Sequence, residues 1–164
     1  MKQVLIIRHA KSSWNNAFSG DFERPLNDRG HRDAPRMAEK IKARGISIQA
    51  FLSSTANRAL TTAVYFAEAY GKTKKDILLH PELYHAPELV FYDVIKTIPA
   101  EIDTAAVFSH NPGITAFVNG LTETRIDNMP TCGIFAIQFE SNRWEDFNTA
   151  KKRFWFFDYP KLDV

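Results

Sequence analysis

Four short apolar runs recur along the chain, and each is followed by polar residues and then by a segment with helical periodicity. The runs occupy residues 3–7, 49–52, 77–79 and 104–108. Because their hydrophobicity is continuous rather than alternating, they predict strands that are buried on both faces. Strands of this kind are typical of parallel sheets whose two faces are covered by helices.

Helical periodicity is found in four segments that alternate with these strands, at residues 31–44, 56–70, 87–98 and 112–121. Gly45 follows the first segment and Gly71 follows the second, and glycine is common where a helix ends. The third and fourth segments begin with proline, which suits a first helical turn. The alternation predicts an α/β fold, a three-layer α/β/α sandwich with a mostly parallel central sheet.

Two further strands are predicted near the end of the sequence, at residues 133–139 and 153–159, as an antiparallel edge joined through residues 140–149. The second contains the apolar run 154–157, for which a buried strand is favoured over an exposed partner surface. No internal repeat, low-complexity tract or linker interrupts the pattern. A length of 164 residues suits one domain, which we expect to span residues 1–164.

The composition argues against several classes of partner. A net charge of +2 is too small to indicate nucleic acid, although it is compatible with an anionic substrate if basic residues converge. No apolar run reaches the roughly 18 residues of a membrane-spanning helix, and the N-terminus lacks a signal-peptide pattern. Cys132 is the single cysteine, so no intrachain disulfide can form. We therefore expect a cytoplasmic protein without nucleic-acid or membrane partners, and the sequence contains no signal for its oligomeric state.

Arginine and histidine side chains follow the predicted strands at the points where these strands end. Arg8 and His9 come directly after the first strand, and His110 follows the fourth. Arg58 lies near the start of the helix after the second strand. Ligands of open α/β sheets bind beyond the carboxyl ends of the strands. We therefore expect these four side chains to meet at one edge of the sheet.

These residue types together suit the transfer of a phosphoryl group. The planar guanidinium of arginine matches phosphate oxygens and stays charged. A neutral imidazole is a nucleophile toward phosphorus, and neighbouring arginines disfavour its protonated form. A second histidine can stabilise the charge of the transition state. The set predicts transfer of a phosphoryl group to His9 and then to water with no cofactor, and no pair of histidines has the spacing of a metal site.

Four motifs resemble those of the histidine phosphatase superfamily, which includes the phosphoglycerate mutases, and they occur in the same order. Residues 8–15 (RHAKSSWN) resemble its RHG-type signature, and residues 27–30 (NDRG) resemble the segment before its first helix. Residues 53–63 (SSTANRALTTA) resemble its S-S-x-x-x-R-A-x-x-T-A segment, and residues 109–112 (SHNP) resemble the segment that supplies the second histidine. The matches are specific when taken together, and they imply a phosphoglycerate mutase-like fold.

The resemblance implies a phosphate pocket made of Arg8, His9, Arg58 and His110. Within it, His9 is implied to be the phosphorylated nucleophile. Asn15 corresponds to an asparagine that contacts phosphate in the mutase branch, and Ser12 in the same loop is a further candidate for phosphate binding. A solvated loop is an equal alternative for Ser12. Ala10 departs from the pattern, because many members have glycine at that position.

The general acid is the part of the pattern that the sequence leaves open. Larger members of the family supply a carboxylate that protonates the leaving oxygen. The matching region here, residues 80–87 (HPELYHAP), contains two candidates. Glu82 is the nearest carboxylate, but it precedes the expected position, and it could equally pair with a base on the surface. His85 lies nearer to the expected position.

The short length and the L-Y-H-A segment resemble the SixA-type phosphohistidine phosphatase branch of the superfamily. A phosphoramidate leaves easily once its nitrogen is protonated, so it needs little help from a dedicated acid. No long insertion is available to cover the site, and an open site would admit a phosphorylated side chain of a partner protein. The alternatives are a phosphomonoesterase acting on a small phosphate ester, a mutase, and a non-catalytic module that binds phosphate.

Overall fold

A six-stranded sheet forms the centre of the computed structural model, which describes residues 1–14 and 20–162. The strands are β1 (Lys2–Arg8), β2 (Ala50–Ser53), β3 (Leu78–Leu79), β4 (Thr104–Ser109), β5 (Ile134–Phe139) and β6 (Lys152–Asp158). Their order in the sheet is β3-β2-β4-β1-β5-β6. The first four strands along the chain pair in parallel, and β5 is antiparallel to both of its neighbours. The sheet is therefore mostly parallel, as predicted.

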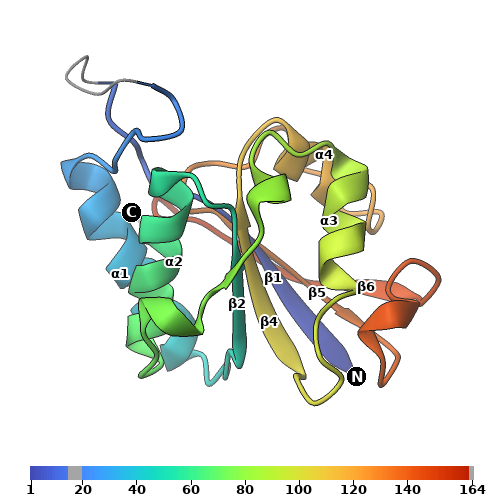
Figure 1. Cartoon of the computed structure of the whole chain (residues 1–164). Helices are drawn as coiled ribbons and strands as arrows, with labels where there is room; N and C mark the ends of the chain where they lie inside the picture. Colours follow the sequence, from blue (N-terminus) through green and yellow to red (C-terminus); the bar gives the residue numbers. More distant parts are fainter. Residues whose placement is uncertain (15–19, 163–164) are drawn as a thin grey trace.

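Helices cover both faces of this sheet (Figure 1). They are α1 (Asp28–Ala43), α2 (Asn57–Ala69), α3 (Glu88–Ile95) and α4 (Gly113–Asn119). The first two pack against each other on one face, and α3 and α4 pack together on the other. The three-layer α/β/α sandwich predicted from the sequence is confirmed. None of the described helices is both long and apolar enough to cross a membrane.

Helix α1 begins three residues before its predicted start because of a capping interaction. The side-chain oxygen of Asn27 accepts a hydrogen bond from the backbone N–H of Gly30 at 2.9 Å, and Asp28 adds a negative charge to the first turn. Both features stabilise the amino end of a helix. Gly45 adopts a left-handed φ of 81° just after the helix, at the predicted stop.

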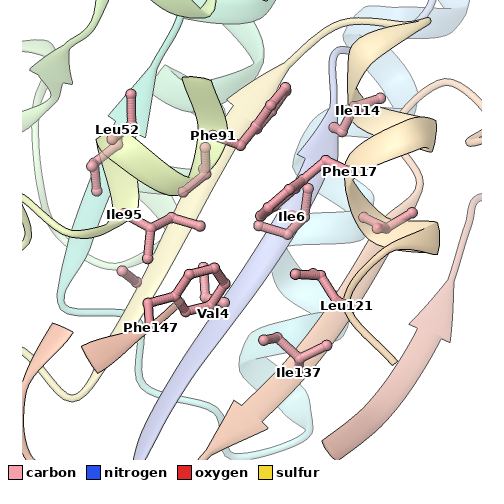
Figure 2. Packing of buried hydrophobic residues seen from close by; sticks show 14 of the residues in the cluster. Val4, Ile6, Leu52, Phe91, Ile95, Ile114, Phe117, Leu121, Ile137 and Phe147 are labelled. Carbon is pink, nitrogen blue, oxygen red and sulfur yellow. The ribbon is translucent and has the colours of Figure 1, made fainter. Parts of the chain in front are cut away.

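Two apolar clusters fill the space between the sheet and its helices. In β1, Val4 and Ile6 belong to the cluster beneath α3 and α4, whereas Leu5 belongs to the cluster beneath α1 and α2. Figure 2 shows the first cluster, in which Phe91 of α3 stacks on Phe117 of α4 with ring centroids 4.8 Å apart. Because both faces of β1 are covered, its hydrophobic pattern is continuous rather than alternating.

The two edge strands differ from the prediction. The strand predicted at 77–79 is only two residues long, and Leu78 and Leu79 are 43% and 51% exposed, so burial on both faces is wrong there. The late antiparallel pair is confirmed as β5 and β6. Within the run 154–157, however, only Phe156 is buried and the other aromatic residues are half-buried. Both differences have one cause, since an edge strand has a neighbour on one side only.

Candidate active site

The parallel register of β1 and β4 brings the two predicted site histidines together. Arg8 lies opposite Ser109, and the backbone N–H of His9 donates to the carbonyl oxygen of Ser109 at 3.1 Å. The ring centroids of His9 and His110 are 5.2 Å apart, and each residue is only 5% exposed. The carboxyl ends of adjacent strands therefore deliver both imidazoles to one place.

The hydrogen bonds of His9 define which ring nitrogen carries the proton. Its Nδ1 lies 2.7 Å from the carbonyl oxygen of Ala10, which can only accept, so Nδ1 is the donor. In the neutral ring, Nε2 then holds the free lone pair. The Nε–H of Arg58 donates to this nitrogen at 3.3 Å. Nε2 of His9 is therefore the nucleophilic atom, and it lies beside a permanent positive charge.

Burial keeps both imidazoles neutral. It lowers the pKa of His9 well below its ordinary value, and the positive charges of Arg8 and Arg58 act in the same direction, whereas the hydrogen bond to the Ala10 carbonyl opposes them. Burial, followed by the charge of Arg58, lowers the pKa of His110 to about 3. A neutral imidazole is the form that attacks phosphorus.

We expect both histidines to stay neutral in the folded protein at pH values below the ordinary histidine pKa, where an exposed imidazole is protonated. In the unfolded chain they would protonate near their ordinary value. The free energy of unfolding contributed by these two groups is therefore fully present above about pH 6.5 and is lost as the pH falls below it. Titration of the imidazole signals by NMR checks this directly. A folded protein in which His9 titrates with an ordinary pKa would contradict it.

Arg58 lies in the first turn of α2 and is buried. Its Nη1 donates to the carbonyl oxygen of Asp21 at 2.6 Å, and its Nη2 donates to Oδ2 of the same residue at 3.0 Å. The loop before this helix also serves the site, because Ser54 Oγ lies 2.8 Å from Nε2 of His110. The segment that follows β2 therefore supplies the arginine and orients the second histidine, whereas Asp21 holds the arginine in place.

These side chains line a cavity of about 340 Å³. Its lining residues are Arg8, His9, Lys11, Ser12, Trp14, Asp21, Arg24, Arg58, His85, His110, Asn111 and Thr131. Nε of Arg8 and Nδ1 of His110 are buried and have no hydrogen-bond partner among the described residues. A buried donor without a partner is costly. The cavity therefore has the size, the charge and the unsatisfied polar groups of a site for an oxyanion.

Sequence comparison decides the family. The family model of the histidine phosphatase superfamily (branch 1) matches residues 4–84, which contain Arg8, His9 and Arg58. The chain belongs to the histidine phosphatase superfamily. Membership supports phosphatase activity on a phosphorylated substrate, either a protein or a small molecule.

Solved structures of similar fold extend the comparison to the whole chain. A structure assigned to the phosphohistidine phosphatase SixA of Agrobacterium tumefaciens is 25% identical, has a TM-score of 0.81, and matches 97% of this chain and 98% of its own. A structure described as the protein histidine phosphatase SixA complexed with tungstate has the same TM-score at 21% identity, covering 96% of this chain and 97% of its own. A phosphoglycerate mutase of Mesorhizobium japonicum, which depends on 2,3-bisphosphoglycerate, is 32% identical over 89 residues, 51% of this chain and 43% of the mutase.

Most of the site residues predicted from the sequence come together in this histidine phosphatase. Arg8, His9, Ser12, Arg58 and His110 all line the cavity. Asn15 lies outside the described residues.

The two candidates for the general acid are separated by the fold. His85 lines the cavity, whereas Glu82 does not. The carboxylate of Glu82 lies 3.3 Å from Nδ1 of His80, which is the surface pairing considered as the alternative. His85 adopts a left-handed φ of 57°, and its ring lies against that of Tyr84, with centroids 3.9 Å apart and planes tilted by 38°. A non-glycine residue in this conformation is strained, and such strain is concentrated at functional sites.

Sequence reasoning missed the acidic and basic residues of the loop before α1. Asp21 and Arg24 both line the cavity, and Oδ1 of Asp21 accepts from Nη1 of Arg24 at 2.8 Å. Arg24 also donates to the hydroxyl of Ser12. No motif considered in the sequence includes either residue. A polar loop has no periodicity from which the direction of its side chains could be predicted.

Proposed function

We propose that this protein is a phosphatase in which Nε2 of His9 attacks the phosphorus atom of the substrate and forms a phosphohistidine intermediate. The proposal rests on one observation, which is that Nε2 of His9 carries a free lone pair beside Arg58. His9 is buried and neutral, its Nδ1 proton is bound to the Ala10 carbonyl, and Nε2 faces Arg58 in a cationic cavity. This is the arrangement that an activated nucleophile requires.

The proposed reaction has two steps. In the first, a bond forms between Nε2 of His9 and phosphorus, while the bond from phosphorus to the leaving oxygen or nitrogen breaks and the leaving group takes up a proton. In the second, water attacks the phosphorylated histidine, loses a proton, and releases inorganic phosphate and free His9. Arg8, Arg58 and His110 bind the non-bridging oxygens and stabilise the negative charge of both transition states.

We further propose phosphohistidine on a partner protein as the substrate. Asp21 is the one carboxylate among the described residues that line the cavity. Hydrogen bonds from Tyr84, Arg58 and Arg24 and the charge of Arg58 lower its pKa below the usual range, although burial opposes them. It is therefore ionised and cannot donate a proton near neutral pH. A phosphoramidate suits such a site because its nitrogen leaves with little acid catalysis, and His85 is the candidate that remains for proton donation.

The substrate proposal is tested by comparing a protein phosphorylated on histidine with para-nitrophenyl phosphate and 3-phosphoglycerate. We expect kcat/KM for the phosphohistidine protein to be higher by about 100-fold or more. Efficient turnover of an ester together with an unchanged phosphoprotein would instead favour the small-molecule phosphomonoesterase. Binding of phosphate without turnover of any of the three would favour the non-catalytic module. Metal independence, the single domain, the cytoplasmic location and the absence of nucleic-acid and membrane partners stay predictions from the sequence.

A further inference from the structure

Asp21 is the centre of a hydrogen-bond network in the lining of the cavity. Its Oδ2 accepts from Nη2 of Arg58 at 3.0 Å and from the hydroxyl of Tyr84 at 2.6 Å, and its Oδ1 accepts from Nη1 of Arg24 at 2.8 Å. Its backbone oxygen accepts from Nη1 of Arg58 at 2.6 Å. Four donors from three residues thus converge on one residue that the sequence motifs do not include.

The network binds the terminal nitrogens of the Arg58 guanidinium and leaves its Nε side to His9. Both terminal nitrogens, Nη1 and Nη2, are bound to Asp21, whereas Nε donates to Nε2 of His9. The guanidinium is planar and its five donors have a rigid geometry, so holding the end of the plane also sets the direction of the Nε edge. That edge faces the atom to which the phosphoryl group is transferred.

Asp21 could act as a general acid, as a general base or as a positioning residue, and each role requires different contacts. A general acid needs a proton to give, but the two guanidinium groups and the Tyr84 hydroxyl stabilise the ionised carboxylate. A general base must bind a proton, but three side-chain donors take three of the about four lone-pair sites of this carboxylate, and the hydrogen bonds of Tyr84, Arg58 and Arg24 hold its pKa below the usual range, so it is a weak base. A positioning role needs only that the contacts to Arg58 persist while the reaction takes place at the Nε edge. The observed contacts meet this last requirement.

We propose that Asp21 is a positioning residue, which holds the terminal nitrogens of Arg58 so that the Nε edge is directed at the phosphoryl group on His9. Tyr84 and Arg24 in turn hold the carboxylate of Asp21. Arg24 is itself held by the carbonyl oxygen of Ser13, which accepts from its Nε at 3.1 Å, so it does not depend on Asp21 alone. The inference rests on the proposed function, because it assigns Asp21 an effect on transfer to and from His9.

The expected kinetic signature is a loss of kcat with little change in KM. Arg8, Arg24 and Arg58 all remain in the Asp21→Ala variant, so the cavity still attracts the phosphate. Only the direction of the Arg58 donors is lost, and misplacement of a group that stabilises the transition state slows the chemical step by about 10- to 100-fold. We expect KM to change by less than about 3-fold, because uniform binding is retained.

A double-mutant cycle separates positioning from direct chemistry. The rate of phosphoryl transfer is measured by single-turnover kinetics in wild type, Asp21→Ala, Arg58→Ala and the double variant, with a phosphohistidine protein and with para-nitrophenyl phosphate. If Asp21 acts through Arg58, its removal has almost no further effect once Arg58 is alanine. Rate losses that multiply in the double variant would overturn the proposal, and so would full activity of Asp21→Ala.

Two more variants keep the test decisive if Asp21→Ala does not fold. Asp21→Asn removes the charge at constant size, and Tyr84→Phe removes a single donor to the carboxylate. Both are expected to lower kcat less than Asp21→Ala, and full activity of both would contradict the proposal.

Asp93→Asn is the matched control, because Asp93 is an exposed carboxylate that pairs with Lys96 away from the cavity. Unaltered activity in a His9→Ala variant would defeat the proposed function itself, whereas multiplicative losses in the cycle defeat only the role of Asp21.

Discussion

Replacement of His9 by alanine is expected to lower kcat/KM by at least about 1,000-fold, because it removes the nucleophile on which both steps depend. The fold should persist. His9 contributes a buried imidazole but lies after β1 rather than inside it, and its backbone hydrogen bonds to Ser109 and Cys132 do not require the side chain. Initial rates with a phosphohistidine protein, together with thermal unfolding of both proteins, give the comparison.

A second histidine variant controls for a general effect of losing an imidazole. His31 is exposed on α1, where its Nδ1 contacts the hydroxyl of Tyr65 at 2.8 Å, and it does not line the cavity. His31→Ala should retain full activity. If His9→Ala and His31→Ala turned over substrate equally fast, His9 would have no part in the reaction.

Replacement of Arg58 by alanine is expected to lower kcat by about 100- to 1,000-fold, the range seen when one donor that stabilises a transition state is removed. Arg58 is the arginine whose Nε contacts the nucleophilic nitrogen, at 3.3 Å. Its loss therefore removes a charge next to the reacting atoms as well as hydrogen bonds to phosphate. Binding of tungstate should weaken in the same variant, and this can be measured by calorimetry.

Lysine at position 58 tests whether geometry or charge matters. Arg58→Lys keeps a positive charge, but an ammonium group cannot bind Asp21 with two fixed donors and still present a third toward His9. We expect it to recover only a small part of the lost activity. Arg32→Ala, which changes an exposed arginine on α1, should behave like wild type. Loss of cooperative unfolding in Arg58→Ala would assign the residue a structural role instead.

The order and type of the elements could be predicted because the central strands are covered on both faces. The central residues of β1 and β4, at 4–7 and 105–108, are all apolar and fully buried, so the hydrophobic pattern is continuous. The edges were less predictable. Leu78 and Leu79 are as apolar as core residues, yet they form a short exposed strand, because burial at an edge depends on which neighbours are present rather than on the local sequence.

The site could be predicted where residues follow directly from strand ends. His9 and His110 are positioned by the register of β1 and β4, and Arg58 is positioned by the helix that follows β2. The two candidates for the general acid were chosen by closeness in sequence alone, and Glu82 does not line the cavity, since it lies in the short 3₁₀ turn Pro81–Leu83 and pairs with His80. Asp21 was missed because its contacts join segments that are 37 and 63 residues apart.

Trapping of the phosphorylated enzyme would reveal the phosphohistidine intermediate on His9 itself. Wild-type protein is mixed with substrate labelled in the phosphoryl group and quenched in alkali, where a phosphorylated histidine survives, and the label is located by peptide mass spectrometry. We expect a transient phosphoryl group on the imidazole of His9, formed and lost at rates that match turnover, and absent from His9→Ala. Turnover without any labelled protein, or a label on a different residue, would contradict it.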